Sequence, residues 1–192
     1  FRELSADERA FYNKIHWDVE VYTESLGGFK EMGGLHYRTD HDLGGHQNAS
    51  GERLDVNIDG KKFVPHVLEL SFGVDRNFWT LLDVFYKDEG DRKVIALPKE
   101  VSPFRAGIFP LQKKGDLEKV AKSVYDNLSK CCDVFYDDSG SIGRRYRRQD
   151  EIGTPFAVTI DFQTLEDNTV TIRERDSMNQ HRVKIEDIWK NI

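Results

Sequence analysis

The chain has 192 residues, of which 38% are hydrophobic and 32% charged, so it is long and apolar enough to bury a core, and its composition argues against disorder. The net charge of −6 lies wholly in residues 1–102, which carry 13 Lys+Arg and 19 Asp+Glu, whereas residues 103–192 carry 15 of each. A globally basic protein is excluded, and any phosphate contact has to use a local patch such as Arg144–Arg148.

The cysteines Cys131 and Cys132 are adjacent, and a vicinal disulfide is strained, so we expect reduced thiols and a cytoplasmic protein. The histidines and cysteines do not have the spacing of a tetrahedral zinc site. No run of 18 apolar residues is present, so we expect no membrane span. The chain starts at Phe1, inside a predicted helix, which suggests a fragment of a longer polypeptide.

The first third predicts an antiparallel sheet. Residues 17–22 (WDVEVY) alternate apolar and acidic side chains, as a half-buried strand does. Gly33-Gly34 loosen the next strand, and such glycines indicate either a bulge or the close approach of a ligand or backbone. In chain order we expect a helix at 6–12, strands at 17–22 and 29–37, a short helix or turn at 40–47 and a polar excursion at 51–62.

A strand, a glycine turn and a helix follow. Residues 63–69 predict the strand, and 78–86 have the apolar spacing of a buried helix, with SFGVDR between them. This is the context that an active-site motif requires. We expect a charged loop at 87–93 and an extended crossing with two prolines at 97–103, and we place a domain boundary near residue 102.

The second half alternates strands and helices, which predicts a mixed sheet layered with helices. The helix at 116–129 has one apolar face, and Asp167-Asn168 is a hairpin-turn signal because Asn tolerates positive φ. The other expected elements are strands at 106–111, 133–136, 156–162 and 169–175, a helix at 142–151, and a strand and helix within 181–192.

Three ordered blocks resemble glycyl-tRNA synthetases of the archaeal and eukaryotic type. Pro65–Arg76 (PHVLELSFGVDR) resembles class II motif 3, Glu31–Leu43 lies at family-like spacing before it, and Asp137–Phe162 with Thr169–Arg182 resembles the anticodon-binding domain. The resemblance implies an α/β (α+β) fold: part of a class II antiparallel-sheet catalytic domain at 1–102, then a mixed-sheet α/β anticodon-binding domain at 103–192.

Arg76 is the candidate for contacting ATP, because a guanidinium never loses its charge and donates bidentate hydrogen bonds to phosphate. From its sequence context alone, Arg76 pairs equally well with Asp75 or Asp83 at the surface. The resemblance favours the nucleotide, and it makes Glu31 a tentative Mg²⁺ ligand, with Asp40 and Asp42 left as structural residues. The implied ATP-binding residues are Glu31, Met32, Gly73, Val74, Asp75 and Arg76.

Glycine has no side chain to bind, so selectivity requires a tight wall together with groups for the ammonium. The resemblance implies glycine binding by Glu69, Leu70, Ser71, Phe72 and Gly73, with Arg76 and Glu69 as catalytic residues that converge on one pocket. The alternative for Glu69 is plain exposure at a strand end.

Anticodon bases are read by base-edge hydrogen bonds and stacking, with cations on nearby phosphates. The resemblance implies contacts from Arg144, Arg145, Arg147, Arg148, Gln149, Glu151, Arg173 and Arg175. Without it, a run of arginines is more often a plain solvated face, in which Arg173 and Arg175 pair with Glu151 and Asp161.

The implied activity is ATP-dependent activation of glycine and its transfer to tRNA(Gly) by a homodimeric full-length enzyme that uses Mg²⁺. The chain has nothing that resembles motifs 1 and 2, so we expect it to be inactive alone. The alternative is a synthetase-like nucleic-acid-binding protein without catalysis, such as a polymerase accessory subunit or a tRNA-binding regulator. Glu31, Glu69, Ser71 and Arg76 are all present, which favours the enzyme.

Overall fold

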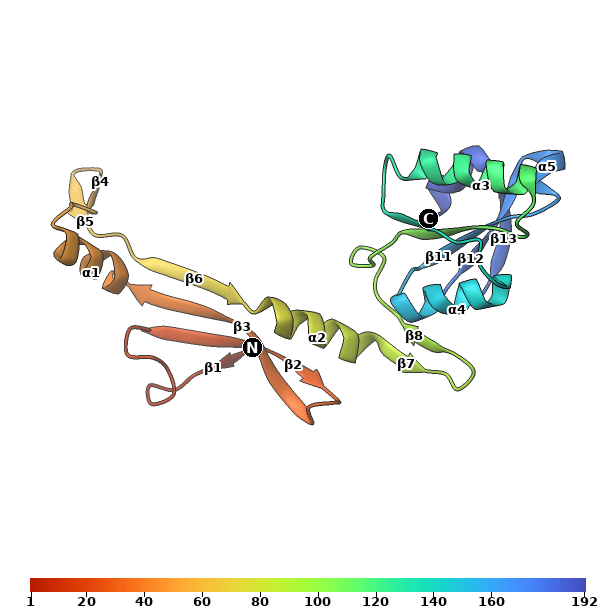
Figure 1. Ribbon diagram of the computed structural model, residues 1–192. Helices are drawn as coiled ribbons and strands as arrows, with labels where there is room; N and C mark the ends of the chain where they lie inside the picture. The colour runs from red at the N-terminus through yellow and green to blue at the C-terminus, as the bar shows by residue number, and fades with distance from the viewer. The chain divides into compact units, whose positions relative to one another are not determined.

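A computed structural model describes all residues, 1–192, as two compact units, Phe1–Val84 and Phe85–Ile192. The N-terminal unit is built on an antiparallel sheet and the C-terminal unit on a mixed sheet between helices (Figure 1). None of the helices is long and apolar enough to cross a membrane.

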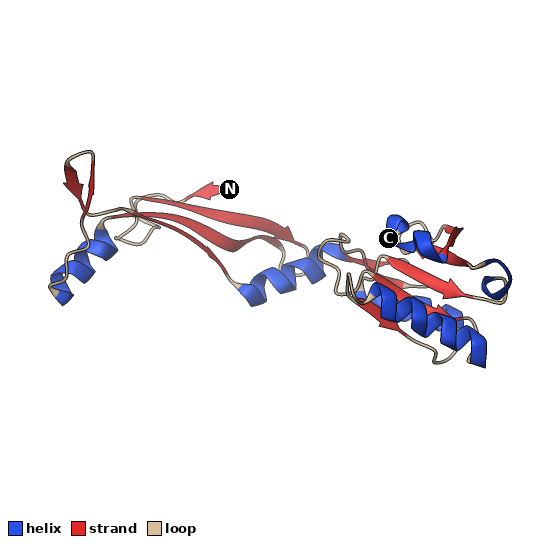
Figure 2. Ribbon diagram, turned by 90° about the horizontal axis from the view of Figure 1, so that it is seen from above, coloured by secondary structure: helices blue, strands red, loops and turns tan.

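The N-terminal unit contains one sheet of four strands in the order β1-β2-β3-β6, in which every neighbour is antiparallel. Figure 2 shows the long strands of this sheet lying between α1 and α2. A small hairpin, β4 with β5, follows α1. The elements are β1 (Arg2–Glu3), β2 (Ile15–Thr23), β3 (Gly28–Thr39), α1 (His41–Ser50), β4 (Val56–Ile58), β5 (Lys61–Phe63), β6 (Val67–Phe72) and α2 (Val74–Phe85).

Strand alternation gives this sheet two chemically different faces. Across β2, β3 and β6, His16 pairs with His36 and His36 pairs with Glu69. In the same way Asp18 pairs with Gly34 and Gly34 with Ser71, so the polar residues of both rows share one face. The other face carries apolar side chains that remain solvent-exposed, including Trp17 (37%), Leu68 (69%), Leu70 (64%) and Phe72 (54%).

Three expectations for this half are wrong. Residues 6–12 form turns instead of a helix. The strand expected at 63–69 is interrupted, since β5 ends at Phe63 and β6 begins at Val67, around Pro65, whose ring nitrogen cannot donate to a sheet. Helix α2 exists but is not buried: Phe78 and Trp79 are more than half exposed, and its one buried residue is Thr80.

The C-terminal unit contains a five-stranded mixed sheet in the order β10-β9-β11-β12-β13. β9 pairs in parallel with β10 and β11, whereas β12 is antiparallel to both of its neighbours. The elements are β7 (Tyr86–Asp88), β8 (Lys93–Ile95), β9 (Ala106–Pro110), α3 (Gly115–Leu128), β10 (Val134–Tyr136), α4 (Ile142–Ile152), β11 (Phe156–Ile160), α5 (Thr164–Asp167), β12 (Thr169–Glu174), β13 (Gln180–Lys184) and a final 3₁₀ helix, η1 (Ile185–Asn191).

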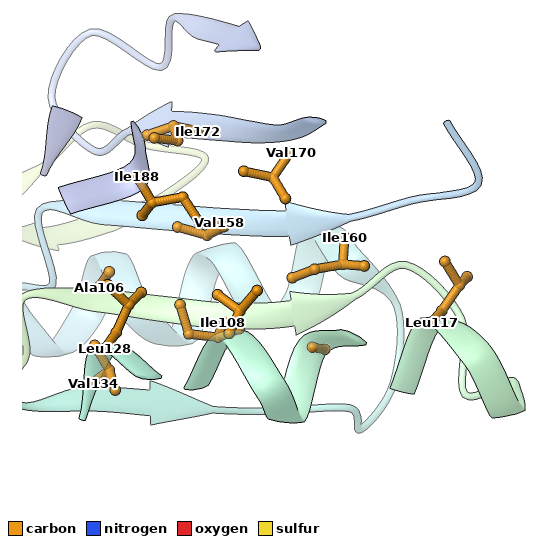
Figure 3. Close-up of a cluster of buried hydrophobic side chains, with 12 residues drawn as sticks. Ala106, Ile108, Leu117, Leu128, Val134, Val158, Ile160, Val170, Ile172 and Ile188 are labelled. Atoms are coloured by element: carbon orange, nitrogen blue, oxygen red, sulfur yellow. The ribbon is translucent and has the colours of Figure 1, made fainter. Parts of the chain in front are cut away.

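The hydrophobic core lies on the α3 side of this sheet (Figure 3). Alternate residues of β9, β11 and β12 point toward the apolar face of α3, and Ile188 of η1 closes the layer. The core consists of Ala106, Ile108, Leu117, Ala121, Val124, Leu128, Val134, Val158, Ile160, Val170, Ile172 and Ile188, each less than a tenth exposed. The mixed sheet and the apolar face of α3 agree with the sequence expectation.

Two connections differ from expectation. Residues 87–93, expected as a charged loop, belong to a hairpin in which β7 pairs with β8. The turn at Asp167-Asn168 follows a short helix, α5, and Asn168 ends it with φ of 57°, the left-handed conformation that Asn tolerates. Residues 85–102 belong to the C-terminal compact unit.

Candidate functional site

A cavity of about 520 Å³ lies in the N-terminal unit at the corner where β6 passes into α2. All six residues implied in ATP binding line it, together with three of the five implied in glycine binding, Ser71, Phe72 and Gly73. The complete lining is Glu31, Met32, Gly33, Ser71, Phe72, Gly73, Val74, Asp75 and Arg76. The structure therefore brings together residues about 40 positions apart in the chain, from β3 and from the strand–helix corner.

The corner is held by close backbone packing and by one amide side chain. A Cβ atom on Gly33 would lie 2.6 Å from the carbonyl oxygen of Ser71, so only glycine fits there. Asn77 Nδ2 donates to the carbonyl oxygens of Met32 (3.0 Å) and Gly73 (2.8 Å) and thereby ties α2 to β3. Asn77 was missed from sequence, although an amide one helical turn after Gly73 is a signal for such a clamp.

Arg76 reaches back across the cavity to β3. Its Nη1 donates to the backbone oxygen of Glu31 at 2.8 Å and lies 3.4 Å from the Glu31 carboxylate, with both side chains at least half exposed. Asp83 instead accepts hydrogen bonds from backbone nitrogens at Glu24 and Ser25. Arg76 is thus not neutralised by Asp83, and its charge faces the cavity.

Glu69 is placed differently from the expectation. It shares the polar face with Ser71 but does not line the cavity, and its carboxylate pairs with Arg38. Arg38 also binds Asp42 through two hydrogen bonds of 2.7 Å, and these lower the pKa of Asp42. Asp42 is therefore structural, as expected, but the predicted convergence of Glu69 and Arg76 on one cavity is not found.

Leu70 is a second correction in this segment. Side chains of a strand alternate between faces, so Leu70 lies on the apolar face, opposite to Ser71 and Glu69. It is 64% exposed and does not line the cavity.

The carboxylates at the cavity are Glu31 and Asp75, and no group of three His, Cys, Asp or Glu residues in the chain is arranged to hold a metal. This set fits Mg²⁺, which typically uses one or two protein carboxylates and takes its other ligands from phosphate and water. Glu31 would be such a ligand after its weak contact with Arg76 opens.

A second candidate surface is formed by α4 in the C-terminal unit. The helix has the basic sequence GRRYRRQDE, and its residues divide between two faces at the helical period. Arg144 and Glu151 are exposed and Arg147 and Arg148 are half-exposed, whereas Arg145, Gln149 and Asp150 are buried.

The buried face of α4 carries an ionic cluster, which we call the Asp150 cluster: Asp150, Arg92 and Arg173. Asp150 accepts from Arg173 at 2.9 and 3.1 Å and from Arg92 at 3.2 Å, and Arg147 lies 3.5 Å away. Arg173 also stacks over Tyr146, 4.9 Å from the ring centroid. A buried carboxylate is thereby compensated by several cations.

Four residues expected to contact the anticodon are buried and bind protein groups instead. Arg173 pairs with Asp150, not with Glu151 or Asp161, and Arg175 donates to the backbone oxygens of Gly153 and Leu97. Arg145 donates to backbone oxygens of Pro110 and Gly140, and Gln149 accepts from Thr154. Their role is structural, because burial leaves them no surface for RNA. Arg92, a member of the cluster, was missed from sequence.

Arg148 is half-exposed but anchored. Its guanidinium donates to Asp137 and to the backbone oxygen of Ser139. Burial by itself would raise the pKa of Asp137, but hydrogen bonds from Ser139 and the pair with Arg148 lower it overall. Arg144, Arg147 and Glu151 thus remain the more available members of the predicted RNA surface.

The chain is similar to known proteins in the regions of both candidate sites. Residues 105–192 match the family described as "Anticodon binding domain". The chain is also similar to glycine–tRNA ligases of Clostridium acetobutylicum, Borreliella burgdorferi and Clostridium tetani. The identities are 44%, 42% and 45%, and the similarity covers 99–100% of this chain. The chain spans 42–45% of the length of these relatives. The chain is therefore similar along its whole length to part of these glycine–tRNA ligases, and residues 105–192 are similar to the anticodon binding domain family.

Proposed function

We propose that the chain is part of an enzyme that activates glycine with ATP and transfers it to tRNA(Gly). The observation that carries the proposal is the cavity at the β6–α2 corner, which gathers Glu31, Ser71 and Arg76 in a chain related to glycine–tRNA ligases. Residues 1–102 then belong to a class II catalytic domain and 103–192 to an anticodon-binding domain, in a homodimeric cytoplasmic enzyme. The two free cysteines support a reducing compartment.

The cavity suits adenylate formation because the reaction needs positioning and charge stabilisation more than covalent chemistry. In this step the carboxylate of glycine attacks the α-phosphate of ATP and pyrophosphate leaves, with no covalent enzyme intermediate. Arg76 is half-exposed and held by a backbone oxygen, so its remaining N–H groups are available to phosphate. Magnesium, when bound, supplies charge neutralisation of the phosphates, and the proposal assigns it to Glu31 with Asp75, the two carboxylates that line the cavity.

The wall of the cavity supports selection of a small amino acid. Gly33 packs closely against the Ser71 backbone and the Phe72 ring, and all three residues line the cavity. Steric exclusion by such a wall rejects side chains that a missing contact alone would tolerate. Glu69 lies on the same sheet face as Ser71, and its carboxylate pairs with Arg38 outside the set of residues that line the cavity.

The exposed face of α4 is proposed to contact the anticodon arm. Arg144 and Arg147 offer cations, and Glu151 offers an acceptor for base edges, on a helix whose other face is fixed by the Asp150 cluster. Rigid presentation lowers the entropy lost on binding.

A pair of variants in the full-length enzyme tests this division of roles. We expect Arg76→Ala to lower glycine-dependent pyrophosphate exchange by about 100-fold, since hydrogen bonds to charged groups contribute about 1.5–3 kcal/mol each. Arg147→Ala and Glu151→Ala should leave this exchange intact and raise the KM for tRNA. Arg53→Ala is the control, because Arg53 pairs with Asp55 outside the cavity. Equal defects in both assays for all variants would contradict the assignment.

The alternative function, a non-catalytic tRNA-binding protein, makes a different prediction. Such a protein would bind tRNA but show no exchange in its full-length form. The isolated 192-residue chain should be inactive in exchange, because it has nothing that resembles motifs 1 and 2; activity of this chain alone would refute that expectation.

A further inference from the structure

The polar face of the N-terminal sheet carries a chain of hydrogen bonds that ends at the cavity. His36 Nε2 lies 3.3 Å from Ser71 Oγ, and His36 Nδ1 lies 3.1 Å from Asn13 Nδ2. The His16 ring packs against His36, with 4.1 Å between centroids, and His16 Nε2 lies 3.1 Å from Asp18. Of these residues, Ser71 alone lines the cavity.

The contact with Asn13 determines which His36 nitrogen carries the proton. An amide nitrogen only donates, so Nδ1 of His36 accepts and Nε2 carries the hydrogen. His36 Nε2–H therefore donates to Ser71 Oγ. The hydroxyl keeps its own proton as a donor for a substrate oxygen, while its acceptor capacity is partly used by His36.

The surroundings keep the His36 ring in this place. The ring lies over Gly34, where a Cβ atom would lie too close to its Nε2 and displace the ring. Asn13 is only 5% exposed, and the turns that replace the expected helix at 6–12 bring it to the ring. Behind His16, Asp18 is only 4% exposed and is bound by Arg2 at 2.9 Å.

We propose that His36 is a positioning residue for Ser71, with Asn13 fixing its tautomer, so that the Ser71 hydroxyl points its proton toward the carboxylate of the amino-acid substrate. This inference rests on the proposed function, because it assigns Ser71 to the amino acid. His36 itself does not touch the substrate.

The arrangement makes amino-acid binding sensitive to acid. Burial lowers the pKa of His36, and the charges of His16 and Arg38 lower it further, while Glu69 and Asp18 oppose them. The ring is therefore neutral at pH 7. Protonation at Nδ1 would place two donors face to face, because Asn13 Nδ2 is also a donor; their repulsion would turn the ring, and a turned ring no longer holds Ser71 through Nε2–H. Affinity for glycine should fall as the pH falls through the pKa of His36.

The functional test uses the full-length enzyme and measures the KM for glycine in pyrophosphate exchange. His36→Ala should raise this KM about tenfold, the size of one net hydrogen bond, with the KM for ATP within about twofold of wild type. His36→Gln should restore most of the affinity, since its amide can donate to Ser71 but does not titrate, and it should abolish the acid-side rise in KM. His181→Gln, in the C-terminal unit, is the matched control.

Two outcomes are distinguishable. Absence of glycine-dependent exchange in the wild type would refute the proposed function and the role of His36 with it. Normal exchange with an unchanged KM in His36→Ala, or an acid-side rise retained in His36→Gln, would refute the role of His36 alone.

A structural readout on the 192-residue chain does not depend on activity. Long-range ¹H–¹⁵N spectra of the imidazoles should show His36 as the Nε2–H tautomer, and Asn13→Ala should shift it toward a mixture of tautomers. A Nδ1–H tautomer in the wild type, or no response to Asn13→Ala, would overturn the proposal.

Discussion

The two units of this molecule differ in how many of their hydrophobic side chains they bury. In residues 1–84, Met32 is the one buried hydrophobic side chain, and an entire face of the sheet exposes residues such as Leu68 and Leu70. In residues 85–192, the sheet, α3 and η1 enclose a continuous core. Because apolar burial is the main favourable term in folding, the C-terminal unit has the larger stability of its own.

The units also treat charge differently. Around the N-terminal cavity, Arg76 and Glu31 stay half exposed, so they are available to a ligand. In the C-terminal unit the Asp150 cluster buries its ions, and these ions fix α4. The comparison shows that the charged residues at the N-terminal cavity stay accessible to a ligand, whereas several charged residues of the C-terminal unit stabilise its fold.

The largest expected contrast is in hydrogen exchange of the intact chain. We expect amides of β9, β11 and β12 to exchange at least about 100-fold more slowly than amides of β2 and β3, since protection follows the free energy of local opening. Exchange measured by NMR or mass spectrometry resolves both sheets in one sample. Equal protection would show that the exposed apolar face does not limit the N-terminal unit.

Asp150→Ala tests the ionic architecture. Removing the carboxylate leaves Arg173 buried without its ionic partner and takes one of two ionic partners from Arg92, which keeps Glu89, so we expect the C-terminal unit to lose about 3–5 kcal/mol of unfolding free energy in urea titrations. Lys119→Ala is the control, because its pair with Asp116 is solvent-exposed and should contribute little. A small effect of Asp150→Ala would mean that the arginines find water or other acceptors.

Matched truncations of apolar side chains test the two surfaces. Ile108→Ala removes a fully buried side chain and should cost about 2–5 kcal/mol. Leu70→Ala removes a side chain that is 64% exposed and should change stability by less than about 0.5 kcal/mol. Denaturant melts of both variants give the two values, and a costly Leu70→Ala would mean that this face is covered.

The smallest effect concerns acid stability. The pKa of Asp137 is lowered in the folded state, so its stabilising contribution is complete above the unfolded value of about 3.9 and is lost as the pH falls below it. Asp137→Asn should cost about 1–2 kcal/mol at pH 7 and flatten the loss of stability below about pH 4. Asp55→Asn, in the N-terminal unit, is the control, since the Asp55–Arg53 pair is exposed on its arginine side. An unchanged pH dependence in Asp137→Asn would contradict the role of the pair with Arg148.

Local sequence patterns correctly predicted the helices that bury one face and expose the other. The helix at α3 shows its apolar face in sequence, and α4 begins at Ile142 as expected, because period and composition agree there. The helix predicted at 6–12 and the buried α2 failed, since apolar residues there make few core contacts and periodicity alone does not say what covers a face. The cavity residues of β3 and of the β6–α2 corner were named from sequence because their motifs carry the chemistry locally.

The sequence by itself determined the alternation of strands and helices around α3 and α4, the strand–turn–helix around Arg76 and the basic character of α4, since all three depend on neighbouring residues. Only the tertiary structure decided which charges are available. The local sequence does not distinguish Arg145, Arg173 and Arg175 from Arg144. Yet these three arginines are buried and donate to Asp150 or to backbone oxygens. Likewise, Asn13, His36 and Ser71 meet across long chain separations. Register and packing set such contacts, and neither is written in local sequence.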